Sequence, residues 1–393
     1  MKALRWVLSA AGVVTVAAAC ADSERDITMP QEDAGPPVVV PPDELPEDAG
    51  LDAAHEADAP VRTCSDDGWC HTVLPPNARL RAVWGDGAGV VWAVAEGGEV
   101  YRWEVDTWKM HAKLDGSLRA IWGSGPTDIW IGGEGGLFHG QGATSAALAF
   151  SPVLTPGDPL DPIVSIWGRD SGDVWAVGGR LDTTPHTGRV LHYAADADGG
   201  AGWSLEDIGD RDVAYTHVWG SSNSGVWLAG VSYKEDIYSD LTTVRRRRSG
   251  EAAFEEVVLP GDPTDPGNGG FGTLYAAGMS DGSVCLVGET LSWRRGDWRG
   301  VSTDDGETFT FTFHAGTPKD QVTHAVSETA SNDSWAAGDY GRLRHWDGKA
   351  WKQSAVTLTH LPLTNGFHAM WRSPANELWV VGDGIAIRRD LSK

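Results

Sequence analysis

The sequence is poor in basic residues. Its 393 residues include 31 Lys and Arg but 55 Asp and Glu, which gives a formal net charge of −24. Proteins that bind nucleic acid or anionic lipid headgroups use clustered positive charge. The composition therefore argues against nucleic acid as a partner and against electrostatic docking on a membrane surface.

Long apolar runs are also missing, apart from one at the N-terminus. Lys2 and Arg5 precede a largely apolar stretch, residues 6–16, which has the form of an export signal. No other stretch reaches the roughly 20 apolar residues that span a bilayer. The rest of the chain is therefore expected to be soluble.

Small residues lead directly to the first cysteine. Ala17-Ala18-Ala19-Cys20 resembles the lipobox of bacterial lipoproteins, although Ala17 stands where that family usually has Leu. The resemblance implies a signal peptide over residues 1–20 and an acyl chain such as palmitate on Cys20. Ala21, in place of an inner-membrane retention Asp, favours the outer membrane. A plain signal-peptidase cut after Ala19 is the alternative.

The next segment has no aromatic residue. Residues 21–60 hold twelve acidic residues, seven prolines and one Arg. Such a composition cannot bury enough apolar surface to offset its ordering entropy, and charge repulsion keeps it extended. We interpret residues 21–62 as a disordered tether and residues 63–393 as a globular head, which retains a net charge near −15.

Cysteine is scarce, with four in the chain. Cys64 and Cys70 flank a short turn, and an oxidising envelope would join them in a disulfide. Cys285 is interpreted as an inert buried thiol. No Cys or His cluster has zinc spacing, and we expect no cofactor.

Tryptophan and glycine are abundant, with 20 and 50 residues. A hydrophobic-Trp-Gly triplet recurs, and a second Trp follows the first after eight residues. Two degenerate copies keep this spacing, so seven units indicate a repeat architecture. The paired positions are Trp84/Trp92, Trp122/Trp130, Trp167/Trp175, Trp219/Trp227, Ala277/Cys285, Ser327/Trp335 and Trp371/Trp379.

Each unit contains four short β-like runs separated by Gly/Asp turns. In the sixth unit the expected strands are residues 322–326, 334–337, 342–346 and 351–358. The pattern predicts an all-β, seven-bladed β-propeller with four-stranded antiparallel blades. The last unit has three strands only, so residues 67–73 are predicted to add its outermost strand and close the ring.

One turn carries a complete motif. Ser302, Asp304, Gly306, Thr308 and Phe309 match the Asp-box pattern. With the repeats, they make residues 64–390 resemble secreted bacterial propellers of the Asp-box (BNR) and photosystem-assembly-factor-like group. The resemblance implies a structural turn between the third and fourth strands, in which Asp accepts backbone N–H groups and Gly adopts the left-handed conformation. Sialidases with such boxes also need a tyrosine nucleophile and three arginines, and that set is not assignable here.

Four inner strands begin with a basic residue. His324, His368, Arg81 and Arg119 each stand three residues before the first repeat position, in consecutive blades. They are predicted to form a basic arc at the channel mouth that suits a small anion or carboxylate. The alternative is that each of them pairs with a nearby acidic residue.

Two further patterns have a structural and a functional interpretation. Paired aspartates in two Pro-rich loops are weak Ca²⁺ candidates, against the alternative of rigid Pro/Asp turns. Residues 245–248 are four arginines, interpreted as a strand with alternating faces rather than a heparin or nucleic-acid patch. The aspartates are Asp158 and Asp161 in one loop and Asp262 and Asp265 in the other.

Insertions converge on one end of the blades. Both second-to-third and fourth-to-first connections lie there, and long loops on a rigid scaffold often carry recognition. Tyr233, Tyr238 and Trp293 supply aromatic anchors of the kind that interfaces favour. We predict that this face is the partner surface. The alternative is that these loops vary only because exposed insertions cost little free energy. The insertions are residues 151–162, 180–188, 231–241, 260–271 and 289–297.

Two functions remain open at this point, because the fold alone does not separate them. The first is a monomeric cell-envelope lipoprotein whose head binds or scaffolds an unidentified envelope protein or glycan without catalysis. The second is a carbohydrate-active enzyme, a glycoside hydrolase or lyase, with its site at the channel mouth. The enzyme needs two carboxylates about 5–10 Å apart facing one cleft, and the sequence isolates no such pair.

Overall fold

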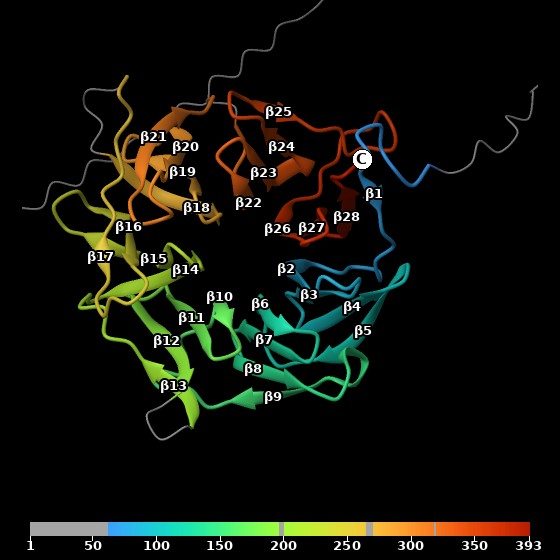
Figure 1. Ribbon diagram of the computed structural model, residues 1–393, viewed down its shortest axis with the longest axis horizontal. Helices are drawn as coiled ribbons and strands as arrows, with labels where there is room; N and C mark the ends of the chain where they lie inside the picture. The colour runs from blue at the N-terminus through green and yellow to red at the C-terminus, as the bar shows by residue number, and fades with distance from the viewer. Residues whose placement is uncertain (1–61, 196–199, 265–269, 318–319) are drawn as a thin grey trace, which may run out of the picture. The chain divides into compact units, whose positions relative to one another are not determined.

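The computed structural model describes residues 62–195, 200–264, 270–317 and 320–393. Their strands form seven four-stranded antiparallel sheets that are arranged in a ring (Figure 1). This is the seven-bladed propeller predicted from the repeats. The leader, Cys20 and residues 21–61 of the tether lie outside the described residues. Within the described part, no helix has the length and apolarity needed to cross a membrane.

The first four blades follow one another along the chain, each with its strands in sequence order from the inside outward. Blade 1 consists of β2 (Leu80–Gly85), β3 (Val91–Ala95), β4 (Glu99–Glu104) and β5 (Thr107–Lys113). Blade 2 consists of β6 (Leu118–Gly125), β7 (Asp128–Gly133), β8 (Gly136–Gln141) and β9 (Ala149–Val153). Blade 3 consists of β10 (Ser165–Asp170), β11 (Asp173–Arg180), β12 (Thr187–Ala195) and β13 (Ala201–Leu205). Blade 4 consists of β14 (Val213–Ser221), β15 (Gly225–Lys234), β16 (Ser239–Arg247) and β17 (Glu255–Glu256).

The remaining blades complete the ring, and the described residues add two single-turn 3₁₀ segments, Ser145–Ala147 and Asp339–Gly341. Blade 5 consists of β18 (Phe271–Met279), β19 (Ser283–Thr290), β20 (Arg295–Val301) and β21 (Thr310–Ala315). Blade 6 consists of β22 (Thr323–Ala330), β23 (Asp333–Gly338), β24 (Leu343–Trp346) and β25 (Trp351–Gln353). Blade 7 consists of β26 (Phe367–Arg372), β27 (Glu377–Gly382), β28 (Ile385–Asp390) and the N-terminal β1 (Cys70–His71).

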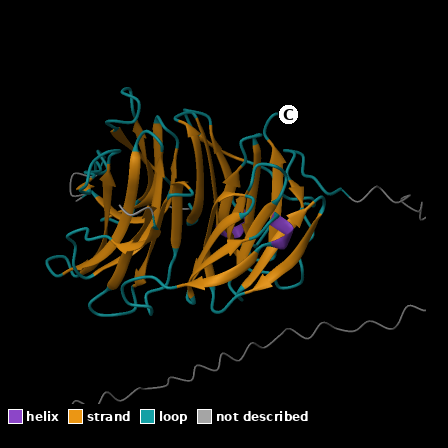
Figure 2. Cartoon of the chain, turned by 60° about the horizontal axis from the view of Figure 1, so that its bottom comes forward, coloured by secondary structure: helices purple, strands orange, loops and turns teal. Residues whose placement is uncertain are grey.

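The antiparallel order places the connections at two ends of the ring (Figure 2). Second-to-third and fourth-to-first connections share one end, which we call the loop face. The predicted insertions in second-to-third connections prove to be partly strand, because β11 reaches Arg180, β15 reaches Lys234 and β19 reaches Thr290. The loop face is therefore raised on lengthened hairpins in blades 3 to 5.

The first Trp of each repeat packs between blades. A Cβ added to Gly123 would lie 2.7 Å from the ring of Trp84, because the indole of blade 1 lies directly on that glycine of blade 2. A side chain there would displace the ring, so Trp in one blade requires Gly in the next. The same contact joins Trp122 to Gly168, Trp167 to Gly220 and Trp371 to Gly85.

Three junctions differ. Between blades 4 and 5, the atoms nearest to a Cβ added at Gly278 belong to Val326 and Glu328 of blade 6 rather than to an indole of blade 4. At the other two junctions the first Trp itself is absent. Ala277 of blade 5 and Ser327 of blade 6 replace the first Trp, and the glycine position of the following blade becomes Glu328 and Arg372, respectively. Both side chains are largely buried, with 1% and 15% of their surface exposed. The space vacated by an indole is therefore filled by a charged side chain of the next blade.

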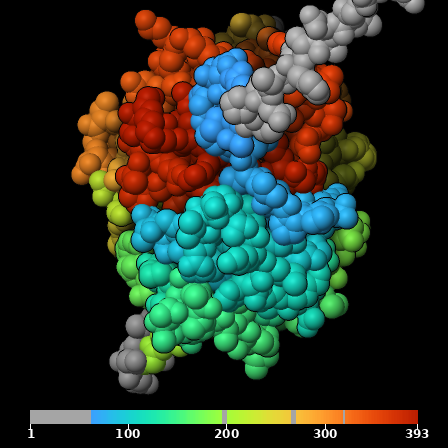
Figure 3. Space-filling view, turned by 90° about the vertical axis from the view of Figure 1, so that its right-hand side faces the viewer, coloured from blue at the N-terminus to red at the C-terminus, as the bar shows by residue number. Residues whose placement is uncertain are grey.

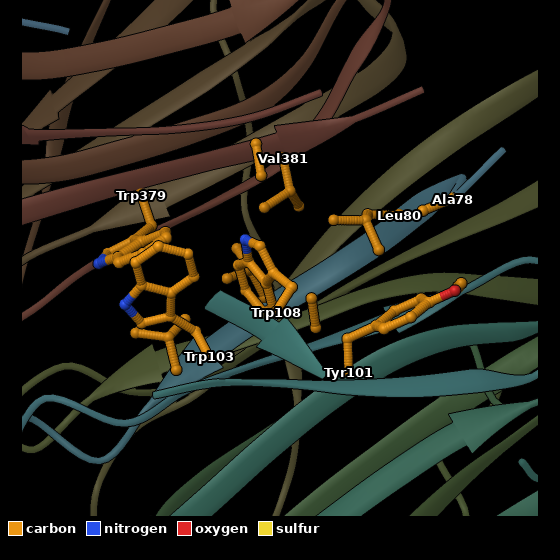
Figure 4. Close-up of a cluster of buried hydrophobic side chains, with 12 residues drawn as sticks. Ala78, Leu80, Tyr101, Trp103, Trp108, Trp379 and Val381 are labelled. Carbon is orange, nitrogen blue, oxygen red and sulfur yellow. The ribbon is translucent and has the colours of Figure 1, made fainter. Parts of the chain in front are cut away.

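Tryptophans also seal the junction between the last blade and the first (Figure 4). The indoles of Trp103 and Trp108 in blade 1 lie 5.3 and 5.7 Å from that of Trp379 in blade 7. All three side chains are buried, together with Leu80 and Val381. This cluster joins residues from both ends of the sequence.

The N-terminal segment completes blade 7, as predicted, and lies against its outer side (Figure 3). Its paired strand is shorter than the predicted residues 67–73, because only Cys70 and His71 pair with β28. Side chains supply the rest of the attachment: Asp67 accepts a hydrogen bond from Ser354, at 2.8 Å, on the connection that leaves blade 6. Cys64 and Cys70 form a disulfide that closes the turn before the strand.

Candidate functional site

The four basic residues at the channel mouth each pair with an acidic residue fifteen positions later. The start of an inner strand and the following second-to-third turn are neighbours on the loop face, which explains the constant interval. The arc of basic residues is thus balanced by an arc of carboxylates. The pairs are Arg81–Glu96, Arg119–Glu134 at 3.0 Å, His324–Asp339 at 2.8 Å and His368–Asp383 at 3.0 Å.

Blades 6 and 7 bring two of these residues into contact. The rings of His324 and His368 are 5.4 Å apart. Burial lowers the pKa of His368, against the opposing effect of its hydrogen bond to Asp383. The neutral imidazole of His368 is therefore favoured.

The second-to-third turns of six blades fall into two groups, and that of blade 3 has no residue with positive φ. In blades 1, 2 and 7, the turn contains a glycine with positive φ: Gly98, Gly136 and Gly384. In blades 4, 5 and 6, the turn has an aromatic residue with positive φ: Tyr238 at 51°, Trp293 at 58° and Tyr340 at 56°. Positive φ is rare and costly for bulky residues. The turns of blades 4, 5 and 6 have four residues between their strands, whereas those of blades 1, 2 and 7 have two or three, and in blade 6 Gly341 also has positive φ, at 66°. A bulky aromatic residue therefore takes a left-handed position in each of the three longer turns.

These aromatic side chains are open to solvent. Tyr238 is 83% exposed, Trp293 82% and Tyr340 64%. Tyr233 lies on the same raised hairpin as Tyr238 and is half exposed. Of the predicted aromatic anchors, Tyr233 and Tyr238 thus share blade 4 and Trp293 stands on blade 5, while Tyr340 of blade 6 was missed. Its short Asp-Tyr-Gly-Arg turn has no insertion to mark it in the sequence.

A cleft of about 400 Å³ lies between blades 5 and 6. Its residues come from the inner strands β18 and β22 and from the outer strands β20, β21, β24 and β25. Trp293 and Tyr340 stand two residues before the cleft residues Arg295 and Arg342. The cleft therefore opens beside two of the aromatic tips.

Three arginines of the cleft converge on Asp320. Arg342 donates to its carboxylate, the guanidinium of Arg344 lies 3.7 Å from it, and Arg295 donates to its backbone carbonyl. Burial alone would raise the pKa of Asp320, but the Thr317 amide and the Arg342 guanidinium lower it. Sequence reasoning missed this cluster, because its members lie on four different elements of two blades.

A buried ionic network lies behind the cleft. Arg299 pairs with Asp297 at 2.8 Å and lies 3.8 Å from Glu328. Burial raises the pKa of Glu328, with Ser334 and Ser283 opposing it by hydrogen bonds. Asp297 lines the cleft, but Glu328 is closed off from solvent, so the two carboxylates do not face one open cleft together as a glycosidase pair must.

In the two Pro-rich loops, the candidate Ca²⁺-binding aspartates form ion pairs with arginines. Arg180 donates to Asp158 at 3.2 Å and to Asp161 at 3.1 Å. Asp262 pairs with Arg294 at 2.8 Å, and Asp265 lies outside the described residues. In the described parts of the chain, no three His, Cys, Asp or Glu side chains are grouped to hold a metal ion.

The four consecutive arginines, residues 245–248, all interact with other groups of the propeller. Arg246 is buried and donates to the Glu307 carbonyl at 2.8 Å, so it fastens blade 4 to the Asp-box turn of blade 5. Arg245 and Arg247 lie on the opposite face of β16 from Arg246, and Arg248 follows the end of that strand. All three interact with neighbours on blades 3 and 4 or on the connection between them. Their partners are Asp210 for Arg245, the Trp175 ring at 4.3 Å for Arg247, and Glu255 at 2.9 Å for Arg248.

The Asp-box residues form the turn between β20 and β21. Asp304 accepts hydrogen bonds from the amide of Thr308 at 2.9 Å and from the Ser302 hydroxyl at 2.8 Å. The Thr308 hydroxyl and amide lower the pKa of Asp304 to about 2. Gly306 has a φ of 90°. Phe309 packs its ring 5.5 Å from Trp227 of blade 4, so the turn serves the junction of two blades.

No family model and no curated protein matches the chain. Solved structures match its fold. YCF48 from Cyanidioschyzon merolae is 13% identical with a TM-score of 0.59, covering 83% of this chain and 100% of that one. A structure titled YCF48 bound to D1 peptide is 16% identical with a TM-score of 0.55, covering 84% and 99%. The WD40 repeats of RRP9 are 9% identical with a TM-score of 0.57, covering 84% and 99%. The head is therefore similar in fold to YCF48 and to WD40 propellers.

Proposed function

We propose that the chain is a cell-envelope lipoprotein whose propeller head is a non-enzymatic binding or scaffolding module. Cys20 anchors it to the outer membrane, and the acidic tether holds the head away from the lipid. The working surface is the loop face of blades 4 to 6. The proposal of an anchor rests on the sequence of residues 17–21.

One observation carries the binding role. Tyr238, Trp293 and Tyr340 have positive φ in the second-to-third turns of three consecutive blades, and all three side chains are largely exposed. Backbone strain of this kind persists where the surrounding structure enforces it, and it gathers at functional sites. Exposed Trp and Tyr are also the side chains that contribute most at interfaces. The strain and the exposure favour a surface that becomes covered by a partner.

The solved structures give this role a precedent in the same fold. One of the similar structures is that of YCF48 bound to D1 peptide. A peptide complex on a seven-bladed propeller supports a binding module rather than an enzyme. The partner of the present chain remains an envelope protein or glycan.

Site-specific photo-crosslinking in the native cells tests the proposal. A photoreactive phenylalanine analogue is placed at Trp293, Tyr238 or Tyr340. The matched control is Val105, which is 85% exposed and also has positive φ, but lies in a third-to-fourth turn at the opposite end. We expect a discrete adduct from the three tips and none from Val105. Equal adducts from Val105, or none from any tip, would overturn the assignment of the loop face.

A further inference from the structure

The cleft between blades 5 and 6 has a charge opposite to that of the whole chain. Its lining contains Arg295, Arg342, Arg344 and Lys349, against Asp297 and Asp320. The protein carries a formal charge of −24, so a net positive cleft stands out. A cleft lined mainly by one sign of charge concentrates ligands of the other sign. This cleft is suited to an anionic group.

The arginines keep donors available. A guanidinium has five N–H donors. Among the described residues, Arg342 makes one hydrogen bond, to Asp320, and Arg344 makes one, to Thr323 at 3.3 Å. Arg295 uses Nε on Glu289 and one further nitrogen on the Asp320 carbonyl. Asp320 therefore orients the three arginines but leaves some of their N–H donors unused. The paired N–H donors of a guanidinium match the two oxygens of a ligand carboxylate.

The apolar part of the lining consists of rings rather than aliphatic pockets. Tyr275, Trp346 and Trp351 line the cleft, whereas its aliphatic residues are only Val287 and two alanines. A bound peptide needs pockets for its side chains, and this lining offers none of aliphatic character. Sugars instead present C–H groups to ring faces, whose negative charge attracts them. Sugar hydroxyls then need short polar groups, which the cleft supplies as Thr317, Gln321, Thr323 and Gln353.

The rim extends the same pattern. Trp293 and Tyr340 precede the cleft residues Arg295 and Arg342 by two residues, and both rings are largely exposed. A cleft of about 400 Å³ falls within the size range of small-ligand sites.

We propose that this cleft binds a carboxylate-bearing oligosaccharide. The arginine cluster around Asp320 holds the carboxylate, and the exposed rings of Trp293 and Tyr340 stack on the sugar units. The rings of Trp346 and Trp351 face Arg299 and Arg344, so they support the arginines rather than the sugar. The proposal rests on the proposed binding role of the loop face and gives that face a ligand class. It adds no catalytic step.

Titration calorimetry on the purified full chain provides the test. The probes are an oligogalacturonate and a sialylated oligosaccharide, which differ in where the carboxylate sits, and a neutral galacto-oligosaccharide of equal length. We expect at least one acidic probe to bind and the neutral one to bind about tenfold more weakly or not at all. Arg342→Gln and Trp293→Ala should each weaken acidic-probe binding by about tenfold. Trp293 is exposed and Arg342 is partly buried against Asp320, so unchanged melting temperatures must verify that both variants fold.

Matched controls lie on the same face and at the opposite end. Arg119→Gln removes a loop-face arginine that is also paired with a glutamate, in blade 2, and Val105→Ala removes an exposed side chain far from the cleft. Neither should change the affinity. Equal binding of the neutral probe, no binding of either acidic probe, or insensitivity to Arg342→Gln would overturn the proposal. An oligoglutamate that binds as tightly, with the same dependence on Arg342, would replace the saccharide by a peptide. Crosslinking from Trp293 tests the binding role of the loop face, and calorimetry tests the saccharide ligand of the cleft. Either proposal can therefore fail while the other holds.

Discussion

Removing the indole of Trp69 should destabilise the attachment of the N-terminal segment, which closes the ring of blades. Trp69 is fully buried although it precedes a strand of only two residues. Its ring lies 5.4 Å from Trp335 of blade 6, edge to face, and its Nε1 donates to the Ser354 hydroxyl at 2.9 Å. One side chain thus connects the N-terminal segment to the blade before the one it completes.

The expected loss is about 4 kcal/mol. Truncation of a buried aromatic residue to alanine typically costs about 3–5 kcal/mol, through lost burial and the cavity that remains. The edge-to-face pair and the hydrogen bond place Trp69→Ala in the middle of that range. Against a total stability of about 5–15 kcal/mol, the variant retains a marginal fold.

Urea denaturation followed by far-UV circular dichroism measures the loss. Trp293→Ala is the matched control: it removes the same side chain from an exposed site, so it should change the free energy of unfolding by less than about 0.5 kcal/mol. Hydrogen exchange adds a local measurement, because β28 should lose protection at Ile387 and Arg388, which pair with β1. A loss below about 1 kcal/mol for Trp69→Ala, with unchanged exchange in β28, would show that the N-terminal segment does not secure the ring.

Three further changes have defined outcomes. Tyr238→Gly and Trp293→Gly relieve positive φ and should leave the free energy of unfolding unchanged or raise it by up to about 1 kcal/mol each, while weakening partner binding; a clear loss of stability in urea would contradict the account of the turns. Burial lowers the pKa of His217, on the inner strand of blade 4, to about 4. Since the unfolded chain then takes up the proton first, stability should fall as pH drops from about 6.5 to 4, and His217→Gln should flatten that part of the profile; an NMR titration with a pKa near 6.5 would refute this. Cys20→Ser should release the protein from the membrane fraction or leave its precursor uncleaved, and unchanged partition into detergent would disprove the lipid anchor.

The repeat was readable from the sequence because it reflects a packing rule between neighbouring blades. Trp in one blade lies on Gly of the next, so the residues recur together and the eight-residue interval survives. The same rule explains the degenerate copies. Where Ala277 and Ser327 replace Trp, Glu328 and Arg372 replace Gly. A charged residue at a glycine position therefore predicts that the preceding blade lacks its indole.

A second rule of the ring was not readable. The residue that pairs across the ladder with the second repeat position is basic in all seven blades. In blades 2, 3 and 6 it is a histidine whose ring stacks on the indole, at 3.7, 3.9 and 4.5 Å. Hairpins of different length place this residue between nine and nineteen positions after the first, so no fixed interval reveals it. The cross-strand pairs are Trp92–Arg102, Trp130–His139, Trp175–His192, Trp227–Arg246, Cys285–Arg299, Trp335–His345 and Trp379–Arg388.

The candidate site was visible only in part, for a related reason. Insertions marked the hairpins of Tyr238 and Trp293, but Tyr340 lies in a turn without an insertion. The positive φ of these residues could not be predicted from the sequence. The cleft arginines became a group only when blades 5 and 6 were side by side. That junction is also where Trp-on-Gly packing gives way to the buried Arg299 network. Loss of the indole at one junction therefore coincides with a cationic cleft and two strained aromatic tips. This coincidence at the junction of blades 5 and 6 is the reason why we propose that junction, rather than the equally degenerate junction of blades 6 and 7, as the ligand site.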